Sequence, residues 1–150
     1  MMFSLSALAD RAIYGRVVSV ADGDTLTVLD AEYQQHKVRL AGIDAPEKAM
    51  PFGQVSKQKL AEICFEKSAE VKIVNIDRYE RAVGDVVCDG VYANEEMVKG
   101  GYAWVYRQYD QGFEAFYPLE QEAKDAKLGL WLDPEPTAPW QWRRAHRLKD

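Results

Sequence analysis

Apolar and β-branched residues alternate with polar ones in the first third of the chain, a pattern typical of short β-strands. It predicts strands over residues 12–20, 25–29 and 36–43. Asp22-Gly23 is a hairpin turn signal between the first two strands. Pro46 ends the third strand, because proline removes a donor from the ladder. Three strands connected in this way can form an antiparallel meander.

The middle of the chain combines one helical stripe with two further strands. Leu60, Ile63 and Cys64 fall on one face of a helix predicted over residues 53–67, because positions three and four apart are neighbours on a helix. Strands are predicted to follow over residues 69–77 and 82–88.

The last third predicts two more helices and then a tail. Asn94 is a good N-cap for a short helix that stops at Gly100-Gly101. Pro118 suits the first turn of a third helix, which Gly129 closes and whose inward-facing residues are Leu119, Ala123 and Ala126. Beyond Trp131, the prolines, tryptophans and basic residues predict an extended, locally basic tail.

The order of elements favours an α+β fold built on a small barrel. Five short strands with attached helices fit the five-stranded Greek-key OB-fold. The chain has 150 residues, of which 47% are apolar and 29% charged, so it has the size and composition of one globular domain. No apolar run approaches the about 20 residues that a membrane-spanning helix needs, and no membrane partner is expected.

The net charge and the number of cysteines limit how this protein can bind a polyanion and which kinds of cysteine site it can have. The formal net charge is -5, whereas a protein that binds nucleic acid through bulk charge is usually basic. A polyanionic partner must therefore be attracted by local features or by a metal ion. The two cysteines, which form no CxxC motif, exclude a disulfide-dense scaffold and a cysteine-rich zinc site.

Four carboxylates could come together if the first three strands form the meander. Asp22 and Asp24 lie at its first turn, and Asp44 and Glu47 follow its third strand. Clustered carboxylates repel one another and need a cation, and oxygen ligands of this kind suit Ca²⁺ or Mg²⁺. The alternative is ordinary turn chemistry, in which aspartate is common.

Two arginines could face a phosphate. Arg39 lies in the middle of a strand, where a partly buried guanidinium must face an anion. Its alternative role is a structural ion pair with one of the carboxylates. Arg81 begins the fifth strand, and two arginines together can bracket a phosphate and stabilise the charge that develops on it.

An aromatic region surrounds Arg107. Its tyrosines and tryptophan can serve as core packing or as a stacking platform for nucleotide bases. The residues are Tyr102, Trp104, Tyr106, Tyr109 and Tyr117.

Short motifs in one order and spacing resemble the staphylococcal nuclease (thermonuclease) family over about residues 13–131. Each motif is weak alone, but their succession is specific. The motifs are VADGDT (20–25), VRLAGIDAPE (38–47), FGQ (52–54), DRYER (77–81) and GLW (129–131).

The resemblance implies a five-stranded OB barrel with three helices and Ca²⁺-dependent hydrolysis of DNA and RNA. Asp24 and Asp44 match the family's calcium carboxylates, and Ala45 stands where a main-chain carbonyl also binds the ion. Glu47 matches the general base that activates water. Asp22 resembles a carboxylate that lies behind the metal ligands.

The resemblance also assigns residues to the substrate. Arg39 and Arg81 match the two phosphate-binding arginines. Arg78, Tyr79 and Tyr109 match positions near the bound nucleotide. The chain departs from the family pattern in three ways: Glu80 replaces the usual glycine, the net charge is acidic, and the loop before the third helix differs.

The cysteines and the N-terminus bear on the cellular compartment. In the family fold the first helix packs near the fifth strand, which implies a disulfide between Cys64 and Cys88; the alternative is a pair of buried free thiols. Residues 1–11 are either an unstructured start or the remnant of an export signal, because Ala7-Leu8-Ala9 resembles a cleavage site but no basic segment precedes it. A disulfide favours export, to the periplasm or outside the cell.

These observations predict a nuclease domain over residues 12–132 and a C-terminal extension over residues 133–150. We expect a monomeric, Ca²⁺-dependent phosphodiesterase of low sequence specificity that acts on single-stranded DNA and RNA and leaves 3′-phosphates. The alternative is a catalytically inactive OB-fold module that binds nucleic acid without cutting it.

Overall fold

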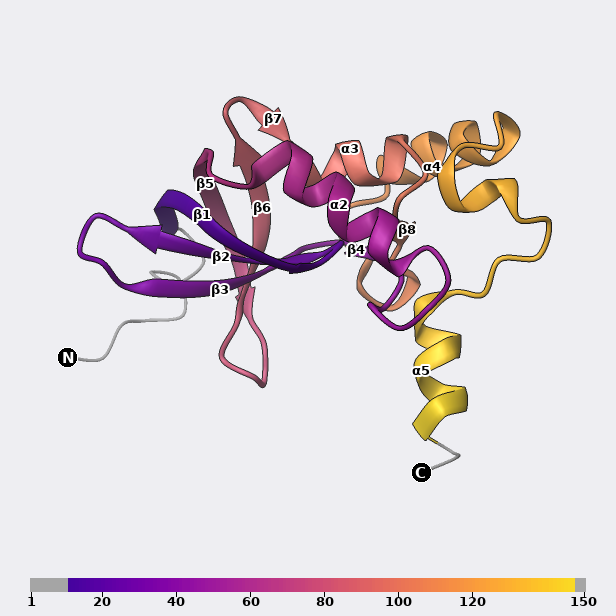
Figure 1. Ribbon diagram of the computed structural model, residues 1–150, viewed down its shortest axis with the longest axis horizontal. Coiled ribbons are helices and arrows are strands. Elements are labelled where there is room, and N and C mark those ends of the chain that lie inside the picture. The colour runs from indigo at the N-terminus through magenta and orange to yellow at the C-terminus, as the bar shows by residue number, and fades with distance from the viewer. Residues whose placement is uncertain (1–10, 148–150) are drawn as a thin grey trace.

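The computed structural model describes residues 11–147, and five of its strands close into a barrel (Figure 1). The strands follow one another in the order β3-β2-β1-β5-β6, and a parallel pairing of β3 with β6 closes the sheet. The predicted α+β class with a five-stranded OB barrel is therefore confirmed. The barrel strands are β1 (Ala12–Asp22), β2 (Thr25–Asp30), β3 (Gln35–Leu40), β5 (Ser68–Ile76) and β6 (Ala82–Cys88).

Outside the five barrel strands, the short strand β7 pairs with β6, and the short strands β4 and β8 pair with each other in a second, two-stranded sheet. Four α-helices lie within residues 11–147, one more than the three that the resemblance implied, and none of them is long and apolar enough to cross a membrane. These elements are β4 (Ile43–Asp44), α2 (Gly53–Cys64), β7 (Val91–Tyr92), α3 (Ala93–Lys99), β8 (Trp104–Val105), η1 (Arg107–Tyr109), α4 (Phe116–Asp125), η2 (Gly129–Leu132) and α5 (Pro139–Arg147).

The predicted strand over residues 36–43 is in fact two strands. Gly42 has a φ of 77°, a left-handed conformation that glycine adopts without strain. A Cβ at this position would lie 2.4 Å from the ring of Phe113. The turn at Gly42 separates β3 from β4 and redirects β4 toward β8.

Asn94 does not cap α3 as predicted. Tyr92 precedes the helix and makes no side-chain capping bond. The buried side chain of Asn94 accepts a hydrogen bond from the amide of Val86 at 2.9 Å and donates to the carbonyls of Ala41 and Gly84. Asn94 therefore fastens α3 to the barrel, and a buried amide with its hydrogen bonds satisfied stabilises this contact.

The other two predicted helices form with small differences. The first ends at Cys64 rather than Lys67, because Phe65 is extended and Glu66 has a positive φ. In α4, Ala123 is buried as predicted, but Ala126 is exposed because it follows the last helical turn.

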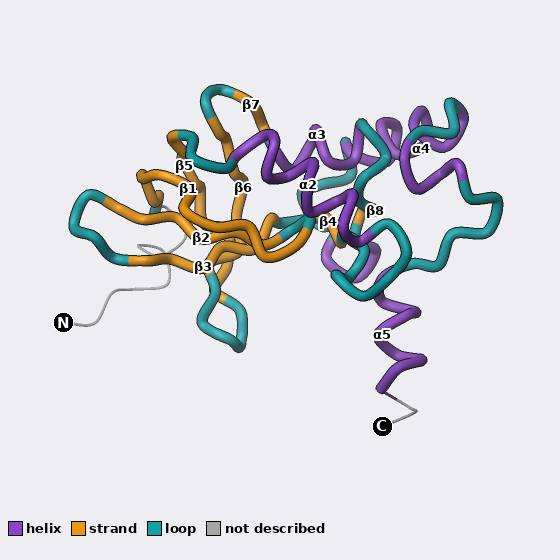
Figure 2. The backbone as a smooth tube through the Cα atoms, in the orientation of Figure 1, coloured by secondary structure: helices purple, strands orange, loops and turns teal. Residues whose placement is uncertain are grey.

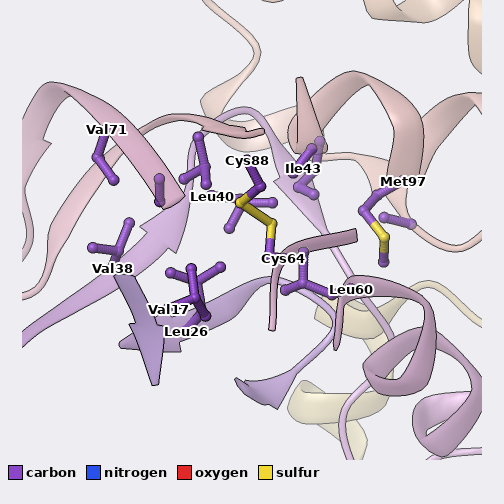
Figure 3. Packing of buried hydrophobic residues seen from close by; sticks show 14 of the residues in the cluster. Val17, Leu26, Val38, Leu40, Ile43, Leu60, Cys64, Val71, Cys88 and Met97 are labelled. Atoms are coloured by element: carbon purple, nitrogen blue, oxygen red, sulfur yellow. A yellow bond between two sulfur atoms is a disulfide. The ribbon is translucent and has the colours of Figure 1, made fainter. Parts of the chain in front are cut away.

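A disulfide joins Cys64 to Cys88 in the core (Figure 3). It links the end of α2 to the end of β6, and both residues are fully buried. Figure 3 shows it between the barrel side chains Val17 and Leu40 on one side and Leu60 on the other. With a sequence separation of 24 between the two cysteines, the loop-closure entropy corresponds to about 3.5 kcal/mol of stabilisation.

Residues 139–147 of the C-terminal extension form a helix, α5, where the sequence predicted an extended tail. Pro139 is the first residue of α5, a position that suits proline because no intrahelical amide donor is lost. Figure 2 shows the linker from η2 to α5 running along the side of the molecule opposite the β2–β3 hairpin. Apart from Arg11, the segment considered as an export-signal remnant lies outside the described residues.

Candidate active site

The turn between β1 and β2 carries the first two carboxylates of the site. Gly23 is buried in this turn, and a Cβ there would lie 2.8 Å from the Cβ atoms of both Ala45 and Ser56. Glycine therefore lets the hairpin approach the loop after β4 this closely. At this contact Ala45 donates its amide hydrogen to Asp24 Oδ2 at 2.8 Å, and the amide of Asp24 donates to Asp22 Oδ1 at 3.0 Å.

Asp24 and Asp44 both lie against Arg39 of β3. Nη2 of Arg39 is 3.6 Å from Asp24 Oδ2 and 3.3 Å from Asp44 Oδ1. Asp24 is 6% exposed and Asp44 0% exposed, and carboxylates buried to this degree need a compensating charge. In the structure Arg39 thus forms the carboxylate ion pair that the sequence left open as its alternative role, and its partners are the two candidate metal ligands.

A second arginine enters the site from the C-terminal helix. Arg143 of α5 places Nη2 at 2.7 Å from Asp44 Oδ2, and Nη1 at 2.8 Å from Glu47 Oε1 and 3.1 Å from Asp44 Oδ1. Asp44 and Glu47 are therefore bridged by one guanidinium group, which comes from a residue 99 positions beyond Asp44.

The sequence interpretation missed Arg143 because it assigned an extended tail to this segment. One signal could have found it. Trp140, Arg143 and Arg147 are spaced by three and four positions, which places them on one face if the segment is helical.

The electrostatics of the site reflect its crowded carboxylates. Burial raises the pKa of Asp22 to about 7, and the adjacent charge of Asp24 acts in the same direction. Burial also raises the pKa of Asp44 to about 6, although hydrogen bonds from Arg143 oppose the change. Burial acts on Asp24 too, but the charge of Arg39 and several hydrogen bonds outweigh it and lower the pKa of Asp24. The positive charges of Arg39 and Arg143 therefore do not fully compensate the negative charges of the carboxylates in the site.

The chemistry of these side chains fits a hard cation, although a ligand sphere is not assembled. Within residues 11–147 no three carboxylate, histidine or cysteine side chains surround a common point closely enough to hold a metal ion. However, oxygen atoms of Asp44 and Glu47 converge on the positively charged Nη1 of Arg143. Asp24 joins the same group through Arg39. Carboxylate oxygens are the ligands that Ca²⁺ prefers.

The second predicted arginine, Arg81, lies directly before the neighbouring strand β6 and pairs with Asp77 rather than with the clustered carboxylates. Arg39 pairs with Val83 across the parallel β3–β6 ladder, and Arg81 precedes β6 by one residue. Nε of Arg81 is 2.7 Å from Asp77 Oδ2. Asp77 also accepts the backbone amides of Arg81 and Tyr79.

The turn between β5 and β6 also holds the first two predicted nucleotide-binding residues. The guanidinium groups of Arg78 and Arg81 lie 5.2 Å and 5.4 Å from the centre of the exposed Tyr79 ring. Glu80 has a φ of 62°, which gives a physical reason for the glycine that the family usually has there.

Tyr106, which the sequence placed only within the aromatic region, connects the predicted Tyr109 to the site. Its ring meets that of Tyr109 edge-on at 4.9 Å, and Arg39 and Arg143 lie 5.3 Å and 5.8 Å from its centre. On α5, Trp140 stacks on Tyr106 with ring centres 5.7 Å apart and planes within 6°. Tyr109 itself is exposed.

Fold and site together define a class: an OB-fold barrel protein with carboxylates and arginines clustered at one end of the barrel. The sequence profile described as "Staphylococcal nuclease homologue" matches residues 37–133. The chain belongs to the staphylococcal nuclease family.

Three relatives illustrate the similarity. The chain is 43% identical to an uncharacterized endonuclease of Haemophilus influenzae, over 96% of this chain and 80% of that protein. It is 40% identical to a micrococcal nuclease of Shigella flexneri, over 98% and 88% of the two chains. It is 41% identical to a probable staphylococcal-like nuclease of Oryza sativa, over 91% of this chain but 45% of that longer protein. These similarities support a nuclease.

Proposed function

We propose that this protein is a Ca²⁺-dependent nuclease that hydrolyses phosphodiester bonds in single-stranded DNA and RNA. We propose further that it has low sequence specificity and leaves 3′-phosphates, as the family resemblance implies. The observation that carries the proposal is the group of carboxylates Asp24, Asp44 and Glu47, bridged by guanidinium groups at one end of the barrel. Asp24, Asp44 and the carbonyl of Ala45 would hold the ion. A bound divalent cation neutralises charge on the scissile phosphate.

The protein's own residues divide the remaining work. Arg39 is held between two buried aspartates, which fix the orientation of its guanidinium group. Arg81 lies at the start of the adjacent strand, and the two arginines would contact the phosphate from neighbouring positions. Such preorganised donors stabilise the charge that develops on the phosphate oxygens.

Glu47 suits the role of general base. Its side chain is 32% exposed, against 0% for Asp44, so water can reach it. A carboxylate in this position can orient the attacking water and accept its proton. Asp22 supports the site from behind by accepting the amide of Asp24.

Exposed aromatic and basic side chains support a nucleotide-binding role around the site. Arg78 and Tyr79 stand in the β5–β6 turn, and Tyr109 stands beside Tyr106. Bases stack on exposed aromatic rings regardless of their sequence, which agrees with low specificity.

A plasmid-nicking assay tests the activity. We expect nicking in Ca²⁺, none in EDTA, and recovery when Ca²⁺ is restored. Asp44→Asn should abolish nicking, whereas Asp89→Asn, an exposed aspartate of the β6–β7 turn, should cut at the parent rate. Mass spectrometry of the oligonucleotide products distinguishes a 3′-phosphate from a 3′-hydroxyl. Retention of an oligonucleotide without cleavage in Ca²⁺ would instead favour the inactive binding module.

We also propose that the protein works as a monomer in an oxidising compartment, outside the cytosol. The disulfide between Cys64 and Cys88 supports this placement, because such bonds are rare where thiols are kept reduced. Labelling with a polyethylene-glycol maleimide in cell fractions tests the compartment. The exported form should stay unlabelled until it is reduced and unfolded. Size-exclusion chromatography tests the oligomeric state.

A further inference from the structure

In the part of the chain that the structure describes, helix α5 is joined to the body through side chains, chiefly those of Trp140 and Arg143 in its first two turns. Ala138 and Pro139 are buried, and Trp140 packs on Tyr106 and Trp104. The following half of the helix, residues 144–147, is exposed. Figure 1 shows α5 projecting from the body beyond β4 and β8. A helix held by so few contacts can leave its place without disturbing the barrel.

The linker before α5 permits such a movement. Residues 132–135 are exposed, and the only main-chain hydrogen bonds described within them are local to the η2 end and the turn at Asp133. The linker ends at Thr137, also exposed, directly before the buried Ala138. Neither the core nor the barrel strands include residues of this linker.

Arg143 uses the oxygen atoms that a metal ion would need. It bonds to both oxygens of Asp44 and to one oxygen of Glu47. A divalent cation bound to Asp44 would meet the guanidinium group at van der Waals distance and at like charge. Arg143 and the cation therefore exclude each other on Asp44.

Trp140 covers a second part of the site. Its ring lies parallel to Tyr106, and Tyr106 in turn lies beside Arg39. The same helix therefore blocks the carboxylates with a charge and the adjacent aromatic face with a ring. Both contacts come from positions one helical turn apart, so they form and break together.

We propose that α5 is an autoinhibitory helix: Arg143 holds Asp44 and Glu47 in the place of the divalent cation, and binding of the cation displaces the helix. This inference rests on the proposed function for the identity of the ion. Docking of α5 lowers the apparent affinity of the protein for the cation, because only molecules with an undocked helix can bind the cation. The helix thus sets the cation concentration at which the site opens.

Calorimetric titration of the full chain with Ca²⁺ tests the competition without any measurement of activity. We expect Arg143→Ala to bind Ca²⁺ at least about 10-fold more tightly than the parent. Arg144→Ala removes the same charge from an exposed neighbour on the same helix and should bind like the parent. Equal affinity of Arg143→Ala and the parent, or weaker binding by Arg143→Ala, overturns the proposal.

The same titration separates this inference from the proposed function. If Arg143→Ala and the parent bind Ca²⁺ with equal affinity, the autoinhibitory role of α5 is wrong, but the proposed Ca²⁺ site is supported. If Arg143→Ala binds no Ca²⁺ at all, the metal site fails and the competition fails with it.

Hydrogen exchange of the unaltered protein supplies a measurement that needs no variant. We expect amides of residues 140–147 to exchange faster in saturating Ca²⁺ than in EDTA, while the barrel strands keep their protection. In Arg143→Ala these amides should exchange fast in both conditions. Unchanged exchange of α5 in the parent on addition of Ca²⁺ overturns displacement of the helix.

Discussion

Two buried carboxylates in this molecule are each held by two basic side chains, Asp44 in β4 and Glu120 in α4. Asp44 is 0% exposed and Glu120 2% exposed. Asp44 contacts Arg39 and Arg143, and Glu120 contacts Arg107 at 2.5 Å and Lys124 at 3.5 Å. By burial and charge alone the two groups look equivalent.

Their remaining partners differ. Glu120 also accepts the backbone amide of Val105 at 2.7 Å, and its basic partners lie at most 13 positions away. Within residues 11–147 the partners found for the Asp44 carboxylate are side chains alone, and one of them arrives on α5. A metal ion cannot take the place of a backbone amide that is fixed in the fold. It can take the place of an arginine side chain that is carried by a separate helix. The comparison therefore distinguishes an acid that holds the fold together from one whose counter-charge can be replaced.

The largest effect on stability is expected at the Glu120 cluster. Glu120→Ala removes the partner of Arg107 and the acceptor of the Val105 amide, and the loss of these hydrogen bonds to a buried charged group costs about 2–3 kcal/mol of unfolding free energy. Urea denaturation measures the change. Glu122→Ala, at an exposed position of the same helix, should cost less than about 0.5 kcal/mol. If the two variants lose the same unfolding free energy, the structural role assigned to Glu120 is wrong.

The largest effect on activity is expected at Arg39. Arg39→Ala should lower the nicking rate in saturating Ca²⁺ by about 10²–10³-fold, as when one preorganised donor to a developing charge is lost. Arg81→Ala should have an effect of the same order. The rates are compared at a temperature at which circular dichroism shows each variant to be folded.

Arg107 provides the matched control for Arg39, because it is also an arginine that pairs with a buried acid. Arg107→Ala should lower stability but leave the rate of the folded enzyme close to that of the parent. Nicking by Arg39→Ala at the parent rate would show that the assignment of Arg39 to the phosphate is wrong.

A smaller effect is expected from pH in the absence of divalent cations. Burial raises the pKa of Asp22 to about 7 and that of Asp44 to about 6, so between pH 4 and 7 the folded state binds more protons than the unfolded state. The unfolding free energy must then fall as the pH rises. We expect a loss on the order of 2 kcal/mol between pH 5 and pH 8 in EDTA.

Denaturation series at several pH values measure this slope. Asp22→Asn should flatten it, because the amide does not titrate, and saturating Ca²⁺ should reduce it by stabilising the ionised carboxylates. A slope of the opposite sign in EDTA would contradict the raised pKa values at the site.

The smallest effect is expected in the β5–β6 turn, away from both clusters. Glu80 adopts a φ of 62°, which costs a residue with a side chain about 1 kcal/mol or more. Glu80→Gly relieves this strain but adds freedom to the unfolded chain, so we expect a net stabilisation below about 1 kcal/mol. Thermal denaturation measures it. Destabilisation by Glu80→Gly would show that the side chain itself holds the turn.

The amino-acid sequence was sufficient for the barrel and for the proximity of the candidate carboxylates. Period-two alternation and the Asp22-Gly23 turn are local signals, because each strand shows which face it buries through its own residues. The proximity of Asp24 and Asp44 follows from the same signals, since Asp24 lies in the β1–β2 turn, β3 pairs with β2, and Asp44 follows β3 by four residues. The motif spacing then supplied the family and, with it, the disulfide.

The other half of the site depends on tertiary structure. The spacing of Trp140 and Arg143 can indicate one face of a helix, but it does not show that this face meets Asp44, 99 positions away from Arg143, or Tyr106. Asparagine is a residue type that often caps helices, yet the side chain of Asn94 is buried against the barrel and holds α3 to it instead. Local sequence patterns indicate the backbone conformation that a residue favours at its own position. Which charge neutralises a buried acid is decided only when distant segments pack, because the free energy of the pair depends on the burial that packing creates.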